Sequence, residues 1–365
     1  MTTRRHAALT LVEMLVVMAI LSVLVLLLLP AVNAAREAGR RTQCMNNQRN
    51  LVLSMVHYES AHLSFPPGLP SCSPRAYNSL GREQGVDCVG PNWAMQVLSL
   101  MEEDTLYEFV LDCVRRQWHA CDDCESQLGN VGRFTPAYMS CPSASAARKL
   151  HQSDRTALAR LSKGNYAACF GSEHYRTAIE GNSRVEREED DLYQVGVLSV
   201  VMIDDYARLT ELTRNGRMSG EWKYALGQGI PALKIKDGTS RTVVLSEVLT
   251  WDGTDRSQDY SEDIRGVWTS GSMGASVYTH KYGPNSPMPD RINACDNALP
   301  REHPLFCEQA RTQGPAAAET WASARSAHCD GVVAALADGS VRFFAADIHL
   351  PVWQALATRA GQDHP

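Results

Sequence analysis

The chain has no cluster of basic residues anywhere along its length. Its 365 residues include 35 lysines and arginines against 41 aspartates and glutamates, which gives a formal net charge of −6. Charges of both signs are interspersed, whereas proteins that bind nucleic acid usually present a basic patch to the phosphate backbone. The composition therefore argues against a nucleic-acid partner.

The chain also lacks the residue patterns of the common catalytic sites. It contains no glycine-rich phosphate loop, no pair of carboxylates at informative positions and no nucleophile beside a base. This absence favours a structural or binding role over an enzyme. We therefore expect no catalytic residue, no bound metal and no cofactor.

Cysteine, in contrast, is plentiful. Eleven cysteines are many for a cytosolic protein and fit an oxidising, extracytoplasmic compartment better. Because the number is odd, at least one thiol is free or pairs with another chain. Cys113, His119, Cys121 and Cys124 cluster in a way that could bind zinc by ligand type. No second Cys-x-x-Cys pair follows at zinc-finger spacing, so disulfides or loop cysteines are the favoured interpretation.

One long apolar run stands near the start of the chain, at residues 9–29. Its sequence is LTLVEMLVVMAILSVLVLLLL, and as a helix it would rise about 31 Å, which matches the hydrocarbon core of a bilayer. The exception is Glu13, because a carboxylate in an apolar helix costs a few kcal/mol in lipid and therefore suggests a function. Arg4 and Arg5 favour a cytoplasmic start. We expect a single-pass segment in the inner (cytoplasmic) membrane with the head outside the cytoplasm.

A secretory signal peptide is the main alternative for this run. It would share the basic start and the apolar core, and Val32-Asn33-Ala34 offers a small-residue cleavage site. The run is long for such a peptide, and Glu13 would have no role in it. A retained membrane helix is therefore favoured.

The helix is expected to continue beyond the membrane segment, over residues 30–64. Pro30 removes one helical hydrogen bond without necessarily ending the helix. Apolar residues then return on one face, at Cys44, Leu51, Val52, Met55 and Val56. The opposite, solvated face is assigned to Arg36, Glu37, Arg40, Arg41, Gln48 and Arg49. Phe65-Pro66-Pro67-Gly68 is expected to stop the helix.

Four further segments carry secondary-structure signals. Residues 93–110 indicate an amphipathic helix, broken near residues 102–104. Residues 193–203 indicate a strand or a buried apolar run, and residues 232–248 read as strand, turn and strand. Residues 351–360 indicate a short closing helix with proline near its start.

Residues 251–321 indicate long loops, in which Cys295 and Cys307 could pair. Acidic side chains in these loops could ligate a hard cation such as calcium, although a solvated loop is the favoured reading; they are Asp252, Asp255, Asp259, Glu262 and Asp263. The charged segment at residues 183–191 is likewise read as a solvated loop.

The clearest local prediction is a β-hairpin near the end of the chain. Residues 332–337 and 340–345 form its strands, and Asp338-Gly339 forms a two-residue turn, because these residues tolerate positive φ angles. His328 would lie just before the first strand. A histidine and an aspartate could suggest catalysis or a metal, but we expect Asp338 and Gly339 to make the turn and His328 to order the preceding loop.

The start of the chain resembles the cleavage site of type IV prepilins. Ala8-Leu9-Thr10-Leu11-Val12-Glu13 is similar to the usual Gly-Phe-Thr-Leu-x-Glu and departs from it at Ala8 and Leu9. The resemblance implies that a prepilin peptidase cuts before Leu9 and methylates the new amine. It also implies that Glu13 neutralises that amine on a neighbouring subunit during assembly.

Further segments resemble the DUF1559 family of large pilin-like proteins. The resemblance rests on the residues after the apolar run and on His328 followed by Asp338-Gly339, which is similar to the family's H-x9-DG element. Its other parts are residues 139–143, 163–166 and 236–240. The resemblance implies an α+β fold in which a long pilin-like helix packs on a mostly antiparallel β-sheet head with long loops. It also implies that Cys44 pairs with Cys141.

The expected organisation is a leader at residues 1–8, a transmembrane helix at 9–29, its soluble continuation at 30–64 and a globular head at 65–365. The function implied is a pilin-like or pseudopilin-like structural subunit of a type IV pilus or type II secretion-type filament. Its expected partners are a prepilin peptidase, other pilin-like subunits and the inner membrane. The alternative is a membrane-anchored module that binds a solute or a surface partner and does not polymerise.

Overall fold

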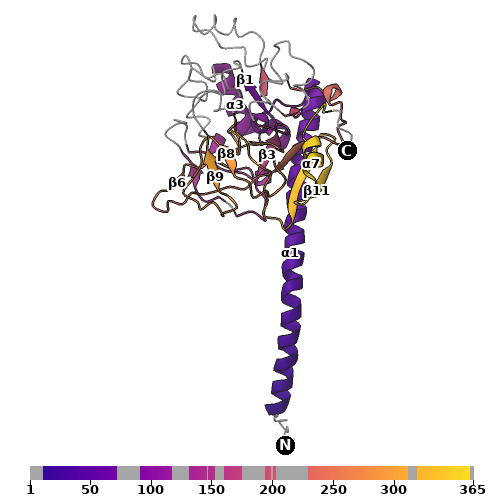
Figure 1. The fold of residues 1–365 in the computed structure, drawn as a ribbon, viewed down its shortest axis with the longest axis vertical. Helices are drawn as coiled ribbons and strands as arrows, with labels where there is room; N and C mark the ends of the chain where they lie inside the picture. The colour runs from indigo at the N-terminus through magenta and orange to yellow at the C-terminus, as the bar shows by residue number, and fades with distance from the viewer. Residues whose placement is uncertain are drawn as a thin grey trace, which may run out of the picture.

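The computed structural model describes residues 11–71, 91–116, 131–145, 147–152, 160–174, 194–198, 200–202, 229–310 and 319–361. In these residues one long helix carries a head built from mixed sheets and long connections (Figure 1). The N-terminal part of the helix projects away from the head, and its C-terminal part lies along it (Figure 1). The expected α+β architecture is confirmed.

Helix α1 spans Leu11–His62 and runs through Pro30 without a break. It ends where Leu63 adopts a positive φ of 58°, two residues before the Phe65-Pro66-Pro67-Gly68 segment that was expected to stop it. Its buried residues begin at Cys44 and recur on one face: Cys44, Asn47, Gln48, Leu51, Val52, Ser54, Met55 and Tyr58. Within the described residues, the apolar run at its start is exposed along its whole length.

Three residues assigned to the solvated face are placed differently: Gln48, Arg41 and Glu37, the last of which is described with its partner below. Gln48 is fully buried, and its amide Nε2 donates to the backbone oxygen of Val333 at 3.0 Å. Arg41 is partly buried, with its guanidinium carbon 3.4 Å from the ring centroid of Phe343. Gln48 lies four residues after Cys44 and therefore shares its face, where the bond to Val333 satisfies its amide nitrogen.

The main sheet has the strand order β11–β10–β5–β3–β7. These strands are β3 (Tyr166–Cys169), β5 (Val243–Glu247), β7 (Val277–Tyr278), β10 (Gly331–Leu336) and β11 (Val341–Ala345). All pairs are antiparallel except β3 with β7. Helix α1 contacts β10, β5 and β11, so the sheet presents one face to the helix.

Among the described residues, the head also contains three sheets of two strands each, and all three are parallel. They pair β1 (Leu69–Ser71) with β4 (Val200–Met202), β2 (Leu150–His151) with β6 (Tyr260–Ser261), and β8 (Asp290–Ile292) with β9 (Cys307–Gln309). The head is therefore mixed, and the expectation of a mostly antiparallel head holds only for the main sheet.

The C-terminal hairpin forms as β10 and β11, but its turn is one residue longer than predicted. Leu336 N donates to Ser340 O at 2.8 Å and Gly339 N donates to Leu336 O at 3.0 Å, which encloses residues 337–339. Gly339 takes a positive φ of 87°, whereas Asp338 does not. Instead, the Asp338 carboxylate accepts from Ser340 N at 2.8 Å. This is the three-residue loop in which a glycine in the left-handed region follows an ordinary turn.

Of the strand, turn and strand predicted for residues 232–248, the turn and the second strand are confirmed and the first strand is wrong. Its second strand is β5, and Gly238 makes the turn with a φ of 97°. The first strand is instead a short 3-10 helix, η6 (Ala232–Lys234), which follows Pro231. A hairpin partner has no place here, because β10 and β3 already occupy the two edges of β5.

The helical predictions are confirmed with shifted ends. Residues 93–116 form α2 (Trp93–Gln96), the 3-10 helix η2 (Leu98–Met101) and α3 (Asp104–Arg116), and the break falls at Glu102, whose φ is 63°. Another 3-10 turn, η3, covers Ala137–Met139. The closing helix α7 spans Leu350–Ala355, with proline near its start, and is shorter than predicted.

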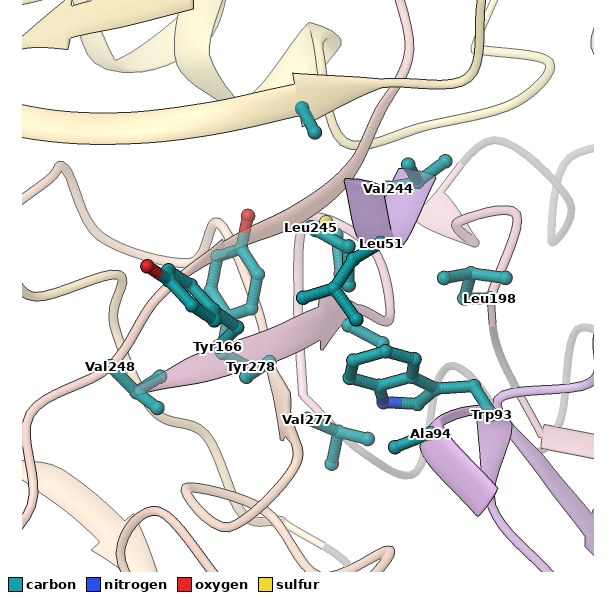
Figure 2. Packing of buried hydrophobic residues seen from close by; sticks show 14 of the residues in the cluster. Leu51, Trp93, Ala94, Tyr166, Leu198, Val244, Leu245, Val248, Val277 and Tyr278 are labelled. Atoms are coloured by element: carbon teal, nitrogen blue, oxygen red, sulfur yellow. The ribbon is translucent and has the colours of Figure 1, made fainter. Parts of the chain in front are cut away.

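One hydrophobic core joins α1, the main sheet and the loops. Its largest buried side chains include Trp93, Trp268 and Trp353. Figure 2 shows Leu51 of α1 among Trp93, Leu245 and Tyr166, so the helix supplies part of the core itself. Because these side chains come from distant parts of the chain, the second half of α1 is fixed to the head by packing.

Residues 251–321 contain long connections around short strands, as expected. Two buried ion pairs organise them: Arg265 with Asp263 at 2.7 Å, and Arg325 with Asp290 at 3.1 Å. Cys295 and Cys307 form a disulfide across this region. Within the described residues, these connections are therefore held by polar and covalent contacts as well as by apolar packing.

Candidate functional site

The first candidate site is the exposed apolar part of α1. Every large apolar side chain from Leu11 to Leu29 is between 49% and 80% exposed. This segment is long and apolar enough to cross a membrane, and it is the one such helix among the described residues. Glu13 lies in its first turn. Ser22 satisfies its hydroxyl within the helix by donating to Met18 O at 2.7 Å.

The second candidate site lies where α1 first meets the head, and it brings together residues from four distant segments. Cys44 of α1 forms a disulfide with Cys141, across a sequence separation of 97. His328, just before β10, and Glu247, at the end of β5, lie beside this disulfide. We call Cys44, Cys141, Glu247 and His328 the junction cluster. One candidate ligand atom from each of them falls within 4.8 Å of all the others.

His328 connects the helix to the sheet through both ring nitrogens. Nδ1 lies 2.8 Å from Oε1 of Glu37 on α1, and Nε2 lies 3.2 Å from Oε1 of Glu247. Nε2 is also 3.6 Å from the sulfur of Cys141. The Glu247 carboxylate is anchored on its other side, where Oε2 accepts from Val333 N at 2.8 Å.

These contacts shift the ionisation of His328 and Glu37. Burial alone would lower the pKa of His328, but the carboxylates of Glu247 and Glu37 outweigh it and raise that pKa above its usual value. Burial opposes ionisation of Glu37 as well, yet hydrogen bonds from His328, Arg40 and Ser143 lower its pKa. The ring therefore favours the charged form when it lies between two carboxylates.

The structure separates the two residues that could have suggested catalysis. His328 and Asp338 stand at opposite ends of strand β10, and Asp338 and Gly339 lie in the hairpin turn. His328 does more than order its loop, because its ring contacts the helix and the sheet together. Its backbone N–H donates to Ser326 Oγ at 3.1 Å, which fixes the preceding turn.

Sequence analysis missed Glu37 and Glu247 as partners of this histidine. Glu37 was assigned to the solvated face of α1, although it lies seven residues before Cys44 and so shares the face that meets the head. That spacing could have identified it. Glu247 follows four apolar or small residues in a buried strand, and a carboxylate in that position indicates a partner.

The acidic residues that could have ligated calcium, the less favoured interpretation of these loops, do not converge. Asp252 accepts from the backbone of Arg148 and Lys149, Asp259 pairs with Arg160 at 2.6 Å, and Asp263 is held by Arg265. Within the described residues, the only group of metal-ligating side chains is the junction cluster.

Several predicted residues lie outside what the structure describes. They are Ala8 and Leu9 of the processing site, the side chains of the Cys113–His119–Cys121–Cys124 group, and the charged segment at residues 183–191. Of the two cysteine pairs that can be followed, the Cys44–Cys141 and Cys295–Cys307 disulfides are both formed as expected.

Comparison with known proteins identifies two matching family models. One is described as "Protein of unknown function (DUF1559)" and matches residues 33–350; the other is described as "Prokaryotic N-terminal methylation motif" and matches residues 3–29. No curated protein and no solved structure matches the chain. The methylation motif is typical of pilin-like proteins that a prepilin peptidase processes, and it implies a membrane-inserted N-terminal helix. The chain therefore belongs to the DUF1559 family and carries the prokaryotic N-terminal methylation motif in front of the family's domain.

Proposed function

We propose that this protein is a pilin-like or pseudopilin-like structural subunit. A prepilin peptidase cuts it between Ala8 and Leu9, and the subunit then assembles through α1 into a type IV pilus or type II secretion-type filament. The observation that carries the proposal is the division of α1: its first half is apolar and exposed, and its second half is built into the head. The methylation motif at residues 3–29 supports the same processing.

The exposed half of α1 has two suitable environments. In the inner membrane, lipid covers its apolar side chains, and the head lies outside the cytoplasm. In a filament, the same side chains pack against the helices of neighbouring subunits. Transfer between the two keeps the apolar surface away from water throughout, so the helix can leave the bilayer without a large hydrophobic cost.

Glu13 is the assembly residue in this proposal. A carboxylate in a low-dielectric environment is expensive, and a nearby positive charge recovers much of that cost. Cleavage before Leu9 creates such a charge, the new amine, on each subunit. Glu13 of one subunit then neutralises the amine of a neighbour and sets the position of one helix relative to the next.

The junction between helix and head fits a structural role. A filament transmits force from one head to the next through its helices, so each head must be firmly fixed to its helix. The Cys44–Cys141 disulfide and the His328 contacts to Glu37 and Glu247 supply that attachment. We therefore propose a structural role for His328, with Asp338 and Gly339 acting only as the hairpin turn.

The test compares three versions of the full chain in its native host. Glu13→Gln should insert into the membrane at the wild-type level but be lost from sheared filaments. Ser22→Ala is the matched control, because its hydroxyl bonds only within its own helix, and it should enter filaments normally. Equal incorporation of Glu13→Gln and wild type would contradict the proposal and favour a membrane-anchored binding module that does not polymerise.

A further inference from the structure

We propose that the junction cluster is a zinc site when its two cysteines are reduced. In the dithiol form, Cys44, Cys141, His328 and Glu247 would bind one divalent zinc-type ion between helix α1 and the head. The inference goes beyond the proposed function and does not depend on filament assembly. It rests on the donor set, on the orientation of His328 and on the position of one Glu247 oxygen inside the cluster.

The donor set is that of a zinc site. Zinc in proteins is usually four-coordinate and takes thiolate sulfur, imidazole nitrogen and carboxylate oxygen. The junction cluster offers two sulfurs, one imidazole and one carboxylate, all buried and all within 4.8 Å of one another. Calcium and magnesium prefer oxygen ligands, so this mixed set selects against them.

The orientation of His328 is the one that a metal ligand requires. A ligating histidine usually donates its other ring N–H to a carboxylate, which fixes the tautomer and the ring plane. Glu37 supplies that carboxylate, 2.8 Å from Nδ1. Nε2 then faces the interior of the cluster, 3.6 Å from the sulfur of Cys141 and 3.2 Å from Oε1 of Glu247. Glu37 is thus a positioning residue and not a ligand.

One carboxylate oxygen of Glu247 faces the His328 ring inside the cluster. Oε2 accepts from Val333 N, whereas Oε1 is buried and lies 3.2 Å from His328 Nε2, its ion-pair partner. With the ring proton on Nδ1, facing Glu37, Nε2 has no proton to donate, and this buried carboxylate oxygen then lacks a donor. Oε1 points toward the sulfurs and the imidazole of the cluster, where a cation would satisfy it.

The disulfide and the metal are alternative states of the same two sulfurs. A newly made chain carries thiols, so the ion can bind before any disulfide exists, and the two thiols release their protons as they become ligands. A disulfide donor then oxidises the site: two thiolates lose two electrons and form the S–S bond. The donor disulfide takes those electrons with two protons and becomes two thiols, and the zinc ion is released. Zinc thereby fixes the helix to the head until the disulfide replaces it.

The test uses the full-length protein in detergent, reduced with a phosphine and titrated with Co²⁺ as a spectroscopic probe for zinc. Wild type should show thiolate-to-cobalt charge transfer and the visible bands of tetrahedral cobalt. Because other cysteines could also bind cobalt, the decisive quantity is a difference. The Cys44→Ser/Cys141→Ser variant should bind one ion fewer per chain than wild type, whereas Cys295→Ser/Cys307→Ser should bind the same number.

Two milder variants test the same site if the cysteine variant fails to fold. Glu247→Gln should lower the affinity of this ion and change its cobalt spectrum, because a ligand is altered. Glu37→Gln should lower the affinity by about 10- to 100-fold while the tetrahedral spectrum is retained, because only the orientation of His328 is affected. The oxidised wild-type chain should bind at least one ion fewer than the reduced chain, because oxidation also removes the thiols of other cysteines. Equal cobalt binding by oxidised and reduced wild type, or no effect of Glu247→Gln, would overturn the proposal.

Discussion

His280 shows how strongly the surroundings of a single residue control its charge. It is fully buried, its ring stacks on Trp353 with centroids 3.6 Å apart, and Nδ1 faces the backbone oxygen of Trp353. Nδ1 must therefore carry the proton, which leaves Nε2 to accept from the Tyr278 hydroxyl at 2.9 Å. Burial lowers the pKa of His280 to about 3, although the bond to Trp353 opposes the shift. His328, between two carboxylates, is shifted in the opposite direction.

The lowered pKa of His280 predicts that the folded head loses stability in acid. An unfolded histidine has a pKa of about 6.5, so below that pH the unfolded chain binds a proton that the folded His280 rejects. The free energy of unfolding should therefore be fully retained above about pH 6.5 and fall, by on the order of a few kcal/mol, as the pH drops towards 3. Urea unfolding at several pH values measures this slope. His280→Gln should flatten it, and an unchanged slope would show that His280 does not cause the loss.

At the residue scale, sequence reasoning identified residue types better than their partners. It selected His328, Cys44 and Cys141, which the structure brings together, but it assigned Glu37 and Gln48 to the solvated face of α1. The reason is physical: a polar side chain on a helix gives no sign of whether a distant strand will satisfy it. The partners of Glu37 and Gln48 are His328 and Val333, almost three hundred residues further along the chain.

At the scale of elements, α1 is a single helix with two different surroundings. Its periodic apolar residues after Pro30 predicted which face meets the head, and Leu51 is indeed only 1% exposed. Leu53 lies two residues further along the helix, on a face turned away from the head, and is 41% exposed. The same residue type thus occurs on both faces of the same turn of helix.

Leu51 and Leu53 provide a matched test of how α1 packs on the head. Leu51→Ala should lower the free energy of unfolding of the head by about 2–5 kcal/mol, because it leaves a cavity among well-packed side chains. Leu53→Ala should change it by only about 0.5 kcal/mol, as is usual for exposed positions. Urea unfolding of both variants, followed by tryptophan fluorescence, measures the difference. Equal losses would mean that α1 does not pack on the head as described.

The disulfide between α1 and the head provides a second test at this scale. It closes a separation of 97 residues, whereas Cys295–Cys307 closes 12. Loop-closure entropy grows with length, from about 3 kcal/mol for a 15-residue loop to about 4.7 kcal/mol for a 100-residue loop. Cys44→Ser/Cys141→Ser should therefore destabilise the chain more than Cys295→Ser/Cys307→Ser does. The opposite order in thermal unfolding would contradict this interpretation.

Elements with a local signal were predictable, whereas those that depend on neighbours were not. The hairpin at Asp338-Gly339 and the helix break at Glu102 follow from nearby residues. The 3-10 helix η6 was mistaken for a strand because residues 232–235 are apolar enough for either. Only the occupied edges of β5 decide between the two. The parallel two-stranded sheets were missed for the same reason, since they pair segments far apart in sequence.

At the scale of the whole molecule, the protein is a head fixed on the long helix α1, whose N-terminal half is apolar (Figure 1). Sequence alone predicted this division, because 21 nearly uninterrupted apolar residues and the prepilin-like motif stand at the start of the chain. It could not predict how the head is attached, because the Cys44–Cys141 bridge and the His328 contacts are formed only by the fold. The proposed function needs both parts: the apolar half of α1 for the membrane and the filament, and the firm attachment for the head.

The mass and N-terminal sequence of the mature protein, purified from its native membrane, test the proposed processing most directly. We predict a chain that begins at Leu9 and carries a methylated amine, since that amine is the charge that Glu13 is proposed to neutralise. A chain that begins at Ala35 would mean signal-peptide cleavage and loss of the apolar half of α1. An intact chain that begins at Met1 would mean a simple membrane anchor. Either of these two results would contradict a processed pilin-like subunit.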